Sequence, residues 1–262
     1  MTKAPREALK ELTTAQSLRY SRHLMLPAMD FAGQEALLAS RVLQIGVGGL
    51  GCAAAPYLVA SGIGALTLVD DDRIDSSNLQ RQILFRESDL GQSKAEVALR
   101  HLSGMNPDTQ LSALTRRLEQ QELQTMLADY DLVLDCSDNL ATRNAINTAC
   151  FATGTPLVSG AAIRLEGQVI SFPMDGKHAC YQCLSQLFGE QQLSCMESGV
   201  LSPLVGVIGS MQALEAIKIV AGVGEPGYGR LHLFDALQGQ WQSFQLPADP
   251  HCAVCGQPAG AD

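Results

Sequence analysis

The chain has 262 residues, 46% of them hydrophobic and 17% charged, with a formal net charge of −9 at pH 7 and a pI near 5.0. This composition suits a well-filled α/β domain and argues against an intrinsically disordered chain. No basic stripe marks a nucleic-acid surface, and the acidic balance is consistent with a cytoplasmic enzyme. Residues 42–69 carry no formal charge, but six glycines and Pro56 interrupt them, so we expect a buried strand–helix–strand unit and no membrane span.

The first two thirds of the chain predict alternating strands and helices. Residues 6–39 are expected to be helical and amphipathic, and Ser-Lys-Ala-Glu at 93–96 matches a capping box that opens a helix ending near Gly104. The other expected elements are strand 41–46, helix 50–61 closed by Gly62, strand 65–70, a loop with a helical turn at 76–85, strands 109–114 and 131–138, helix 139–154, and strands 156–161 and 167–172. This alternation over 41–161 predicts a Rossmann-like, mostly parallel sheet with helices on both faces.

The pattern changes after about residue 165. A loop-like stretch at 185–202 precedes a helix over 203–220, and residues 230–236 and 240–246 predict an antiparallel pair of strands. Only short connections separate these elements, so we expect a single domain over 1–262. Its parts are a helical segment at 1–40, a nucleotide-binding core at 41–165, and a C-terminal part at 166–262 that holds two cysteine pairs.

A glycine-rich turn follows the first strand, with the spacing Gly46-x-Gly48-x-x-Gly51. Gly48 lets the backbone approach a phosphate, and Gly51 lets the next helix pack close to the strand. Asp70 comes 19 positions after Gly51, where an acid can bind ribose hydroxyls. This pattern predicts a nucleotide site; the alternative is a turn that needs its glycines only for packing.

Polar residues after this turn argue for a triphosphate. Asn78, Arg81 and Lys94 follow the ribose acid closely, and cations such as Arg and Lys stabilise charge that develops at phosphorus. Asp138 ends a buried strand, where a carboxylate can hold magnesium. No Walker lysine loop is present, and no histidine or Tyr–Lys pair stands out for hydride transfer. A nicotinamide oxidoreductase and a non-catalytic scaffold remain the rival hypotheses, and each cation taken alone could be a solvated surface charge.

Cysteine spacing predicts a metal site. Cys180-x-x-Cys183 and Cys252-x-x-Cys255 form two pairs, and four thiolates make a closed, structural zinc site. The alternative is two redox pairs. Cys195 lies in a polar loop, where it is either a nucleophile or a thiol without a catalytic role.

Six motifs stand in the order found in the bacterial relatives of ubiquitin-activating enzymes: "RYSRHLML", "GVGGLGC", "LVDDDRIDSSNLQRQ", "LDCSDN", "CYQC" and "CAVC". Over nearly its whole length the chain resembles this MoeB/ThiF family. "LVSGAAIRLEGQ" and "CYQCLSQLFGE" look closer to the group that serves molybdopterin synthase. "DDDRIDSSNLQRQILF" also resembles the group of the thiamine pathway, which stays the alternative.

The resemblance implies an adenylyltransferase for molybdenum cofactor biosynthesis. ATP, accompanied by Mg²⁺, would adenylate the C-terminal glycine of a small ubiquitin-like sulfur carrier ending in Gly-Gly, and pyrophosphate would leave. Residues 166–262 would bind the carrier. The implied catalytic residues are Arg22, which reaches across a homodimer, Arg81, Lys94 and Asp138. The implied nucleotide-binding residues are Gly46, Gly48, Gly49, Gly51, Asp70, Asp72, Ser77, Asn78, Leu79, Gln80, Arg81, Lys94, Asp138 and Asn139.

Two further expectations concern sulfur. The chain ends seven residues past Cys255, so we expect a separate protein to donate the sulfur. Cys195 matches the position that carries sulfur or a thioester in thiamine-pathway and ubiquitin-activating relatives. In relatives that serve molybdopterin synthase, adenylation does not require it, so it is not among the implied catalytic residues.

Overall fold

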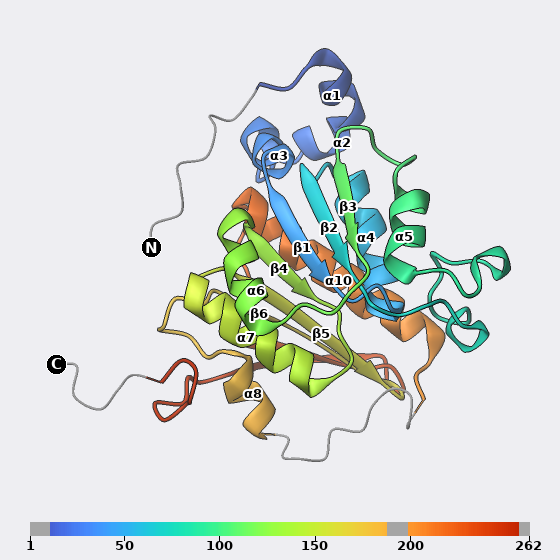
Figure 1. Cartoon of the computed structure of the whole chain (residues 1–262). Coiled ribbons are helices and arrows are strands. Elements are labelled where there is room, and N and C mark those ends of the chain that lie inside the picture. The colour runs from blue at the N-terminus through green and yellow to red at the C-terminus, as the bar shows by residue number, and fades with distance from the viewer. Residues whose placement is uncertain (1–10, 188–198, 257–262) are drawn as a thin grey trace.

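One continuous eight-stranded sheet organises the protein (Figure 1), with the strand order β3-β2-β1-β4-β5-β6-β7-β8. The computed structural model describes residues 11–187 and 199–256. Strands β1 to β5 pair in parallel, and β5 to β8 pair antiparallel, as the sequence predicts. The strands are β1 (Arg41–Ile45), β2 (Ala65–Val69), β3 (Gln110–Leu114), β4 (Leu132–Asp135), β5 (Leu157–Ile163), β6 (Glu166–Phe172), β7 (Arg230–Asp235) and β8 (Gln240–Gln245).

Helices cover both faces of this sheet (Figure 1). One face carries α3 (Asp30–Leu38), α4 (Gly49–Ala60), α5 (Lys94–Leu102) and α10 (Ser202–Ala221). The other face carries α6 (Gln120–Met126), α7 (Leu140–Thr153) and α8 (Tyr181–Leu187). Two short helices, α1 (Thr14–Arg19) and α2 (Ser21–Leu24), precede α3, and 3-10 turns lie at Ser76–Asn78, Glu87–Asp89 and Leu127–Asp129.

Three sequence expectations need correction. The expected helix over 6–39 is broken into α1, α2 and α3 within the described residues, because Tyr20 leaves the helical conformation and a turn containing Pro27 follows. Helix α6 was not foreseen, since its sequence QQELQTM is short and mostly polar. Helix α8 was also missed, and it takes the start of the stretch expected to be a loop.

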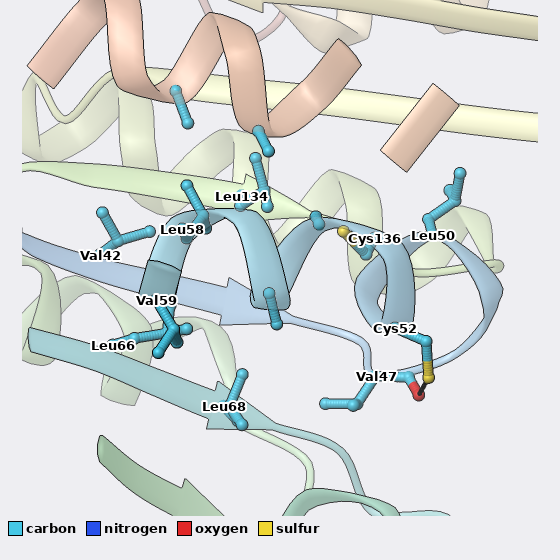
Figure 2. Close-up of a cluster of buried hydrophobic side chains, with 14 of the residues drawn as sticks. Val42, Val47, Leu50, Cys52, Leu58, Val59, Leu66, Leu68, Leu134 and Cys136 are labelled. Carbon is cyan, nitrogen blue, oxygen red and sulfur yellow. Dashed lines mark hydrogen bonds between the residues drawn. The ribbon is translucent and has the colours of Figure 1, made fainter. Parts of the chain in front are cut away.

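Alternation along the strands produces two hydrophobic cores, one on each face. Val42 of β1 packs with α4 and α10, whereas its neighbour Leu43 packs with α6 and α7. Figure 2 shows the first core, in which Leu58 and Val59 of α4 lie over the sheet. The thiol of Cys52 donates a 3.3 Å hydrogen bond to the Val47 carbonyl, which ties α4 to the turn before it.

The helix ends agree with their cap residues. Ser93 caps α5, with its hydroxyl 3.5 Å from the Glu96 amide. Asn139 caps α7 by accepting a 2.9 Å hydrogen bond from Thr142, and Gly154 ends this helix at φ +64°. These caps place the N-termini of α5 and α7 near the carboxyl edge of the parallel strands.

Helix α10 is long and apolar enough to cross a membrane, with 20 residues and a mean hydropathy of 1.6. Length and composition alone are weak evidence, because the core helix of a globular protein meets the same criterion. In this protein, 50% of the most apolar 18-residue stretch of α10 is buried, because the helix packs against α4 and β5. Gly209 permits this close packing, since an added Cβ there would lie 2.4 Å from the Leu50 carbonyl oxygen.

Candidate nucleotide and metal sites

A cavity of about 1120 Å³ opens at the carboxyl ends of β1, β2 and β4. Helix α4, which follows β1, covers one face of the sheet, and α7, which follows β4, covers the other. The chain therefore leaves the neighbouring strands β1 and β4 toward opposite faces of the sheet, and a crevice forms between the two connections. Ligands of open α/β sheets bind at this kind of switch point.

Most of the predicted nucleotide-binding residues line this cavity: Gly46, Gly48, Gly49, Asp70, Asp72, Ser77, Asn78, Arg81, Lys94, Asp138 and Asn139. Four predicted residues are not in its lining. Gly51 packs beneath the turn, Leu79 is half-buried against the first core, and Gln80 accepts a hydrogen bond from the Ser202 hydroxyl through its carbonyl. Arg22 is exposed on α2, with its guanidinium 3.6 Å from the Met25 sulfur.

Backbone sterics explain the glycines of the turn. Gly46 has φ +95°, and an added Cβ would lie 2.5 Å from the Cys136 carbonyl oxygen. An added Cβ at Gly51 would lie 2.2 Å from the Gly46 carbonyl oxygen. Gly48 is the N-cap of α4 and has no side chain to cap it, so the first N–H groups of the helix stay available to an anion.

The acid at the end of β2 is fixed by the backbone. Asp70 accepts a 2.7 Å hydrogen bond from the Val47 amide and a 2.9 Å hydrogen bond from the Asp72 amide. Burial raises the pKa of the Asp70 carboxyl, and Lys94 and these two amides oppose that effect. Asp70 is therefore a held, partly desolvated acceptor at the rim of the cavity.

Lys94 reaches the same rim from the first turn of α5. Its ammonium lies 2.8 Å from the Asp72 carboxylate, and the Lys94 side chain is 7% exposed while that of Asp72 is 66% exposed. This packing holds the ammonium beside the cavity.

The loop after β2 is braced from within. The Asp75 carboxylate accepts hydrogen bonds from the Ser77 amide at 2.9 Å and the Ser77 hydroxyl at 2.7 Å, and these bonds lower the pKa of Asp75. Arg81 donates a 3.0 Å hydrogen bond to the Ser77 carbonyl. The loop thus presents Asn78 and Arg81 to the cavity in a defined arrangement.

Several lining residues were missed by the sequence reasoning. Arg143 and Ser137 line the α7 side, and Arg73, Gln82, Arg116 and Arg117 line the other walls. Asp135, at the end of β4, supports the α7 side of the cavity. A carboxylate inside the buried strand "LVLD" requires a partner, and this was the available signal for Asp135 and Arg143.

The four paired cysteines meet at one point, as their spacing predicts. All four sulfurs lie within 4.8 Å of one another, and Cys180–Cys252 and Cys183–Cys255 are separated by 3.8 and 3.4 Å. Zinc with Zn–S distances of about 2.3 Å separates its sulfurs by roughly 3.8 Å, whereas a disulfide needs about 2.0 Å. The cluster therefore fits a four-thiolate zinc site. Cys195 lies outside the described residues.

A second close group of potential ligands, Asp70, Asp71 and Asp72, is already engaged. Asp70 is bonded to two amides, Asp71 lies 3.6 Å from Arg117, and Asp72 pairs with Lys94. These pairings hold the three carboxylates in place at the rim of the cavity.

Comparisons with known proteins agree with this geometry. The model of the ThiF family matches residues 20–254. The chain is 50% identical to the molybdopterin-synthase adenylyltransferase of Escherichia coli, over 95% of this chain and 100% of that protein. It is 46% identical to the E. coli sulfur carrier protein ThiS adenylyltransferase, over 91% of this chain and 95% of that protein.

The fold is also that of a solved structure. E. coli MccB with ATP superposes with a TM-score of 0.80 at 24% identity, covering 93% of this chain and 75% of that one. A family match over most of the chain and a relative that is half identical identify the chain as a member of the ThiF family.

Proposed function

We propose that this protein uses ATP to adenylate the C-terminal carboxylate of a small ubiquitin-like sulfur carrier of molybdenum cofactor biosynthesis. One observation carries the proposal. A single cavity brings together the glycine turn, Asp70, Arg81, Lys94 and Asp138, which are the groups that a nucleoside triphosphate requires. The 50% identity to a molybdopterin-synthase adenylyltransferase supports this carrier class.

ATP would bind along the carboxyl edge of β1 and β2. The lone pairs of Asp70 left free by the two amides would accept from the ribose hydroxyls. The phosphates would lie at Gly48 and the N-terminus of α4, within reach of Asn78 and Arg81. Most of the missed cations have acidic partners: Arg116 pairs with Glu122, Arg117 with Asp71 and Arg143 with Asp135. We therefore assign the phosphate contacts to Asn78, Arg81 and Lys94.

The reaction would be an attack by a carboxylate on the α-phosphorus. A carrier carboxylate oxygen forms the new P–O bond, the bond between the α-phosphorus and the bridging oxygen breaks, and pyrophosphate leaves with the electron pair. The carboxylate is ionised at neutral pH, so the step needs no strong general base. Arg81 and Lys94 would stabilise the charge that develops on the phosphoryl oxygens, with Lys94 exchanging Asp72 for phosphate.

Asp138 would hold the magnesium that accompanies ATP. Its exposed carboxylate lies in the cavity lining next to Asn139, and magnesium usually binds proteins through one or two carboxylates. The bound ion would neutralise part of the phosphate charge.

The carrier would enter from the C-terminal part, 166–262. The cavity extends along the β5–β6 hairpin, where the lining residues Ala161, Ala162 and Gly167 leave room for an extended Gly-Gly tail. The body of the carrier would rest on β8. All residues of this strand are exposed, and they include the aromatic residues Trp241 and Phe244.

The position of Arg22 supports a proposal about assembly. Since this side chain is exposed on α2 and does not line the cavity of its own chain, we propose that it completes the cavity of a second copy in a homodimer. We further propose that the protein works in the cytoplasm with a separate sulfur donor.

ATP–pyrophosphate exchange tests the function. Purified, zinc-loaded protein is mixed with Mg²⁺, ATP and labelled pyrophosphate, and the molybdopterin and thiamine carriers are added in separate tubes. We expect carrier-dependent exchange with the molybdopterin carrier. Exchange with the thiamine carrier alone would instead support the second candidate, which the 46% identity to a ThiS adenylyltransferase favours. No exchange with either carrier would contradict the proposal.

A further inference from the structure

Arg143 is a buried cation that neither the glycine motif nor the cysteine motif explains. Its side chain is 6% exposed, and its guanidinium lies 3.6 Å from the carboxylate of Asp135, which is 1% exposed. It donates hydrogen bonds to the Ser159 hydroxyl at 3.1 Å, to the Gly160 carbonyl at 2.7 Å and to the Ser137 carbonyl. Burying an ion pair costs several kcal/mol per ion in desolvation, and well-packed apolar side chains could fill the same space. The network therefore suggests a role beyond packing.

This network fixes the turn that ends at Asp138. Asp135 accepts hydrogen bonds from the Ser137 amide at 3.0 Å and the Ser137 hydroxyl at 2.6 Å, while Arg143 holds the Ser137 carbonyl. The amide, hydroxyl and carbonyl of Ser137 are thus all held. Asp138 is the next residue, so the origin of its side chain is set by the Asp135–Arg143 pair.

The same guanidinium lies over the ring of Tyr181, the neighbour of Cys180 in the chain. The Arg143 Cζ lies 5.7 Å from the centre of the Tyr181 ring, which also meets Phe172 edge-on. Tyr181 directly follows Cys180 and starts α8. A movement of this ligand segment would therefore change the packing on Arg143.

A second link runs along α7. Asn147 lies one helical turn after Arg143 and is fully buried. Its amide group donates to the Cys180 sulfur at 3.5 Å and accepts from the Tyr181 amide at 2.8 Å. One face of α7 thus bears Arg143 on the Asp138 turn and Asn147 on the cysteine cluster.

We propose that Arg143 is a positioning residue that couples the four-cysteine site to Asp138, with α7 and Tyr181 as the connecting elements. When the metal site is intact, Cys180 holds Tyr181 against Arg143, and Arg143 holds the turn that presents Asp138. The metal would then act on the nucleotide site as well as on the stability of the fold. Only the consequence at Asp138 rests on the proposed function.

Hydrogen exchange measured by mass spectrometry tests the coupling without any ligand. In the metal-loaded variant Tyr181→Leu, we expect peptides covering residues 132–140 to exchange at least tenfold faster than in the wild type, and the glycine turn at 44–50 to be unchanged. Tyr181→Phe keeps the ring and removes only the hydroxyl, so it should have a smaller effect than Tyr181→Leu.

Tyr130→Leu is the matched control. Tyr130 is also buried and has a guanidinium, that of Arg41, 5.7 Å from its ring centre. This pair lies at the amino ends of β1 and β4, where the Tyr130 hydroxyl also bonds to Thr67. Its loss should therefore affect the start of β4 and leave exchange at 136–140, beyond the other end of the strand, unchanged. If Tyr181→Leu fails to fold, chelation of the metal from the wild type, at a temperature where its circular dichroism stays native, should speed exchange in the same peptides.

A second readout connects the coupling to the nucleotide. Tyr181→Leu should raise the Mg²⁺ concentration for half-maximal ATP binding about tenfold. Tyr181 also lines the cavity, so the Kd of AMP should change too, but by much less. Two results would overturn the coupling. One is hydrogen exchange at 132–140 that stays at the wild-type rate in the folded Tyr181→Leu variant or after chelation. The other is an equal effect of Tyr181→Leu and Tyr130→Leu on exchange at 136–140. If the wild-type protein binds no ATP, the proposed function is contradicted instead. The hydrogen-exchange result would still test the coupling, because it needs no ligand.

Discussion

The two sides of the cavity are built in different ways. On the β1–β2 side, backbone sterics and backbone hydrogen bonds form the surface: Gly46 and Gly51 allow close contacts, and amides hold Asp70. On the β4–α7 side, a buried ion pair between Asp135 and Arg143 holds the turn to Asp138.

This difference separates two kinds of sensitivity. A site built from backbone contacts fails when a side chain is added, because the neighbouring backbone cannot move away cheaply. A site built from a buried ion pair fails when a partner is lost, because a charge is left without compensation.

The largest expected effect is at the end of the α7 side. Asp138→Asn should lower carrier-dependent ATP–pyrophosphate exchange about 100- to 1000-fold, the usual loss for one group that stabilises transition-state charge. The melting temperature should stay within a degree or two, since Asp138 is exposed. Asp71→Asn is the control, because it removes the same charge from the rim of the same cavity. Equal losses in both variants would show that only the local charge matters.

The β1–β2 side is tested by adding one methyl group. Gly51→Ala places a Cβ 2.2 Å from the Gly46 carbonyl oxygen, and relief of such overpacking costs about 1–3 kcal/mol of unfolding free energy. In Gly104→Ala the new Cβ meets no atom within 4 Å, so stability should change little. Urea denaturation of the two variants measures the difference. A Gly51→Ala protein as stable as Gly104→Ala would contradict the steric account of the turn.

The smallest expected effect is on pH dependence. Because burial raises the pKa of Asp70 above 3.8, the folded protein binds this proton more tightly than the unfolded chain does. The contribution of Asp70 to stability is therefore largest at low pH, and it is lost as the pH rises through the raised pKa. Ribose binding needs the ionised acceptor, so it should have the opposite dependence and weaken on acidification.

Adenosine simplifies this test, because it carries the ribose without titrating phosphates, and comparison with Asp70→Asn removes the dependence that protonation of the adenine base contributes. Its affinity should fall with decreasing pH, with a midpoint above 3.8, over the range in which circular dichroism remains native. The Asp70→Asn variant should bind adenosine weakly and without this dependence. A wild-type affinity that stays flat across the range would exclude Asp70 as the ribose acceptor.

The contrast between the two sides also explains what the sequence could predict. The glycine turn, Asp70 and the cysteine pairs are encoded by local spacing, so β1, α4, β2 and the meeting of the four cysteines were foreseen, whereas α8 at the first cysteine pair was not. Helix α6 was missed because seven mostly polar residues carry no clear hydrophobic period. Arg143 was missed because its partners, such as Asp135 and Gly160, come from different elements, and their meeting depends on the tertiary fold.

Gly51, Leu79 and Gln80 show a second limit of prediction from sequence motifs. They belong to motifs that surround the cavity, yet they support the lining from behind. A motif marks the segment that forms a site, but it does not distinguish the residues that face the ligand from those that shape the backbone.

The mass of the carrier after incubation tests the central claim most directly. The molybdopterin carrier, Mg²⁺ and ATP are mixed with the wild-type protein or with Asp138→Asn, without a sulfur donor, and intact carrier is measured by mass spectrometry. The account predicts that the wild type adds one AMP to the carrier, at its C-terminal glycine, and that Asp138→Asn leaves the carrier unmodified. A carrier that stays unmodified with the folded, metal-loaded wild type, or that is modified equally by both proteins, would contradict it.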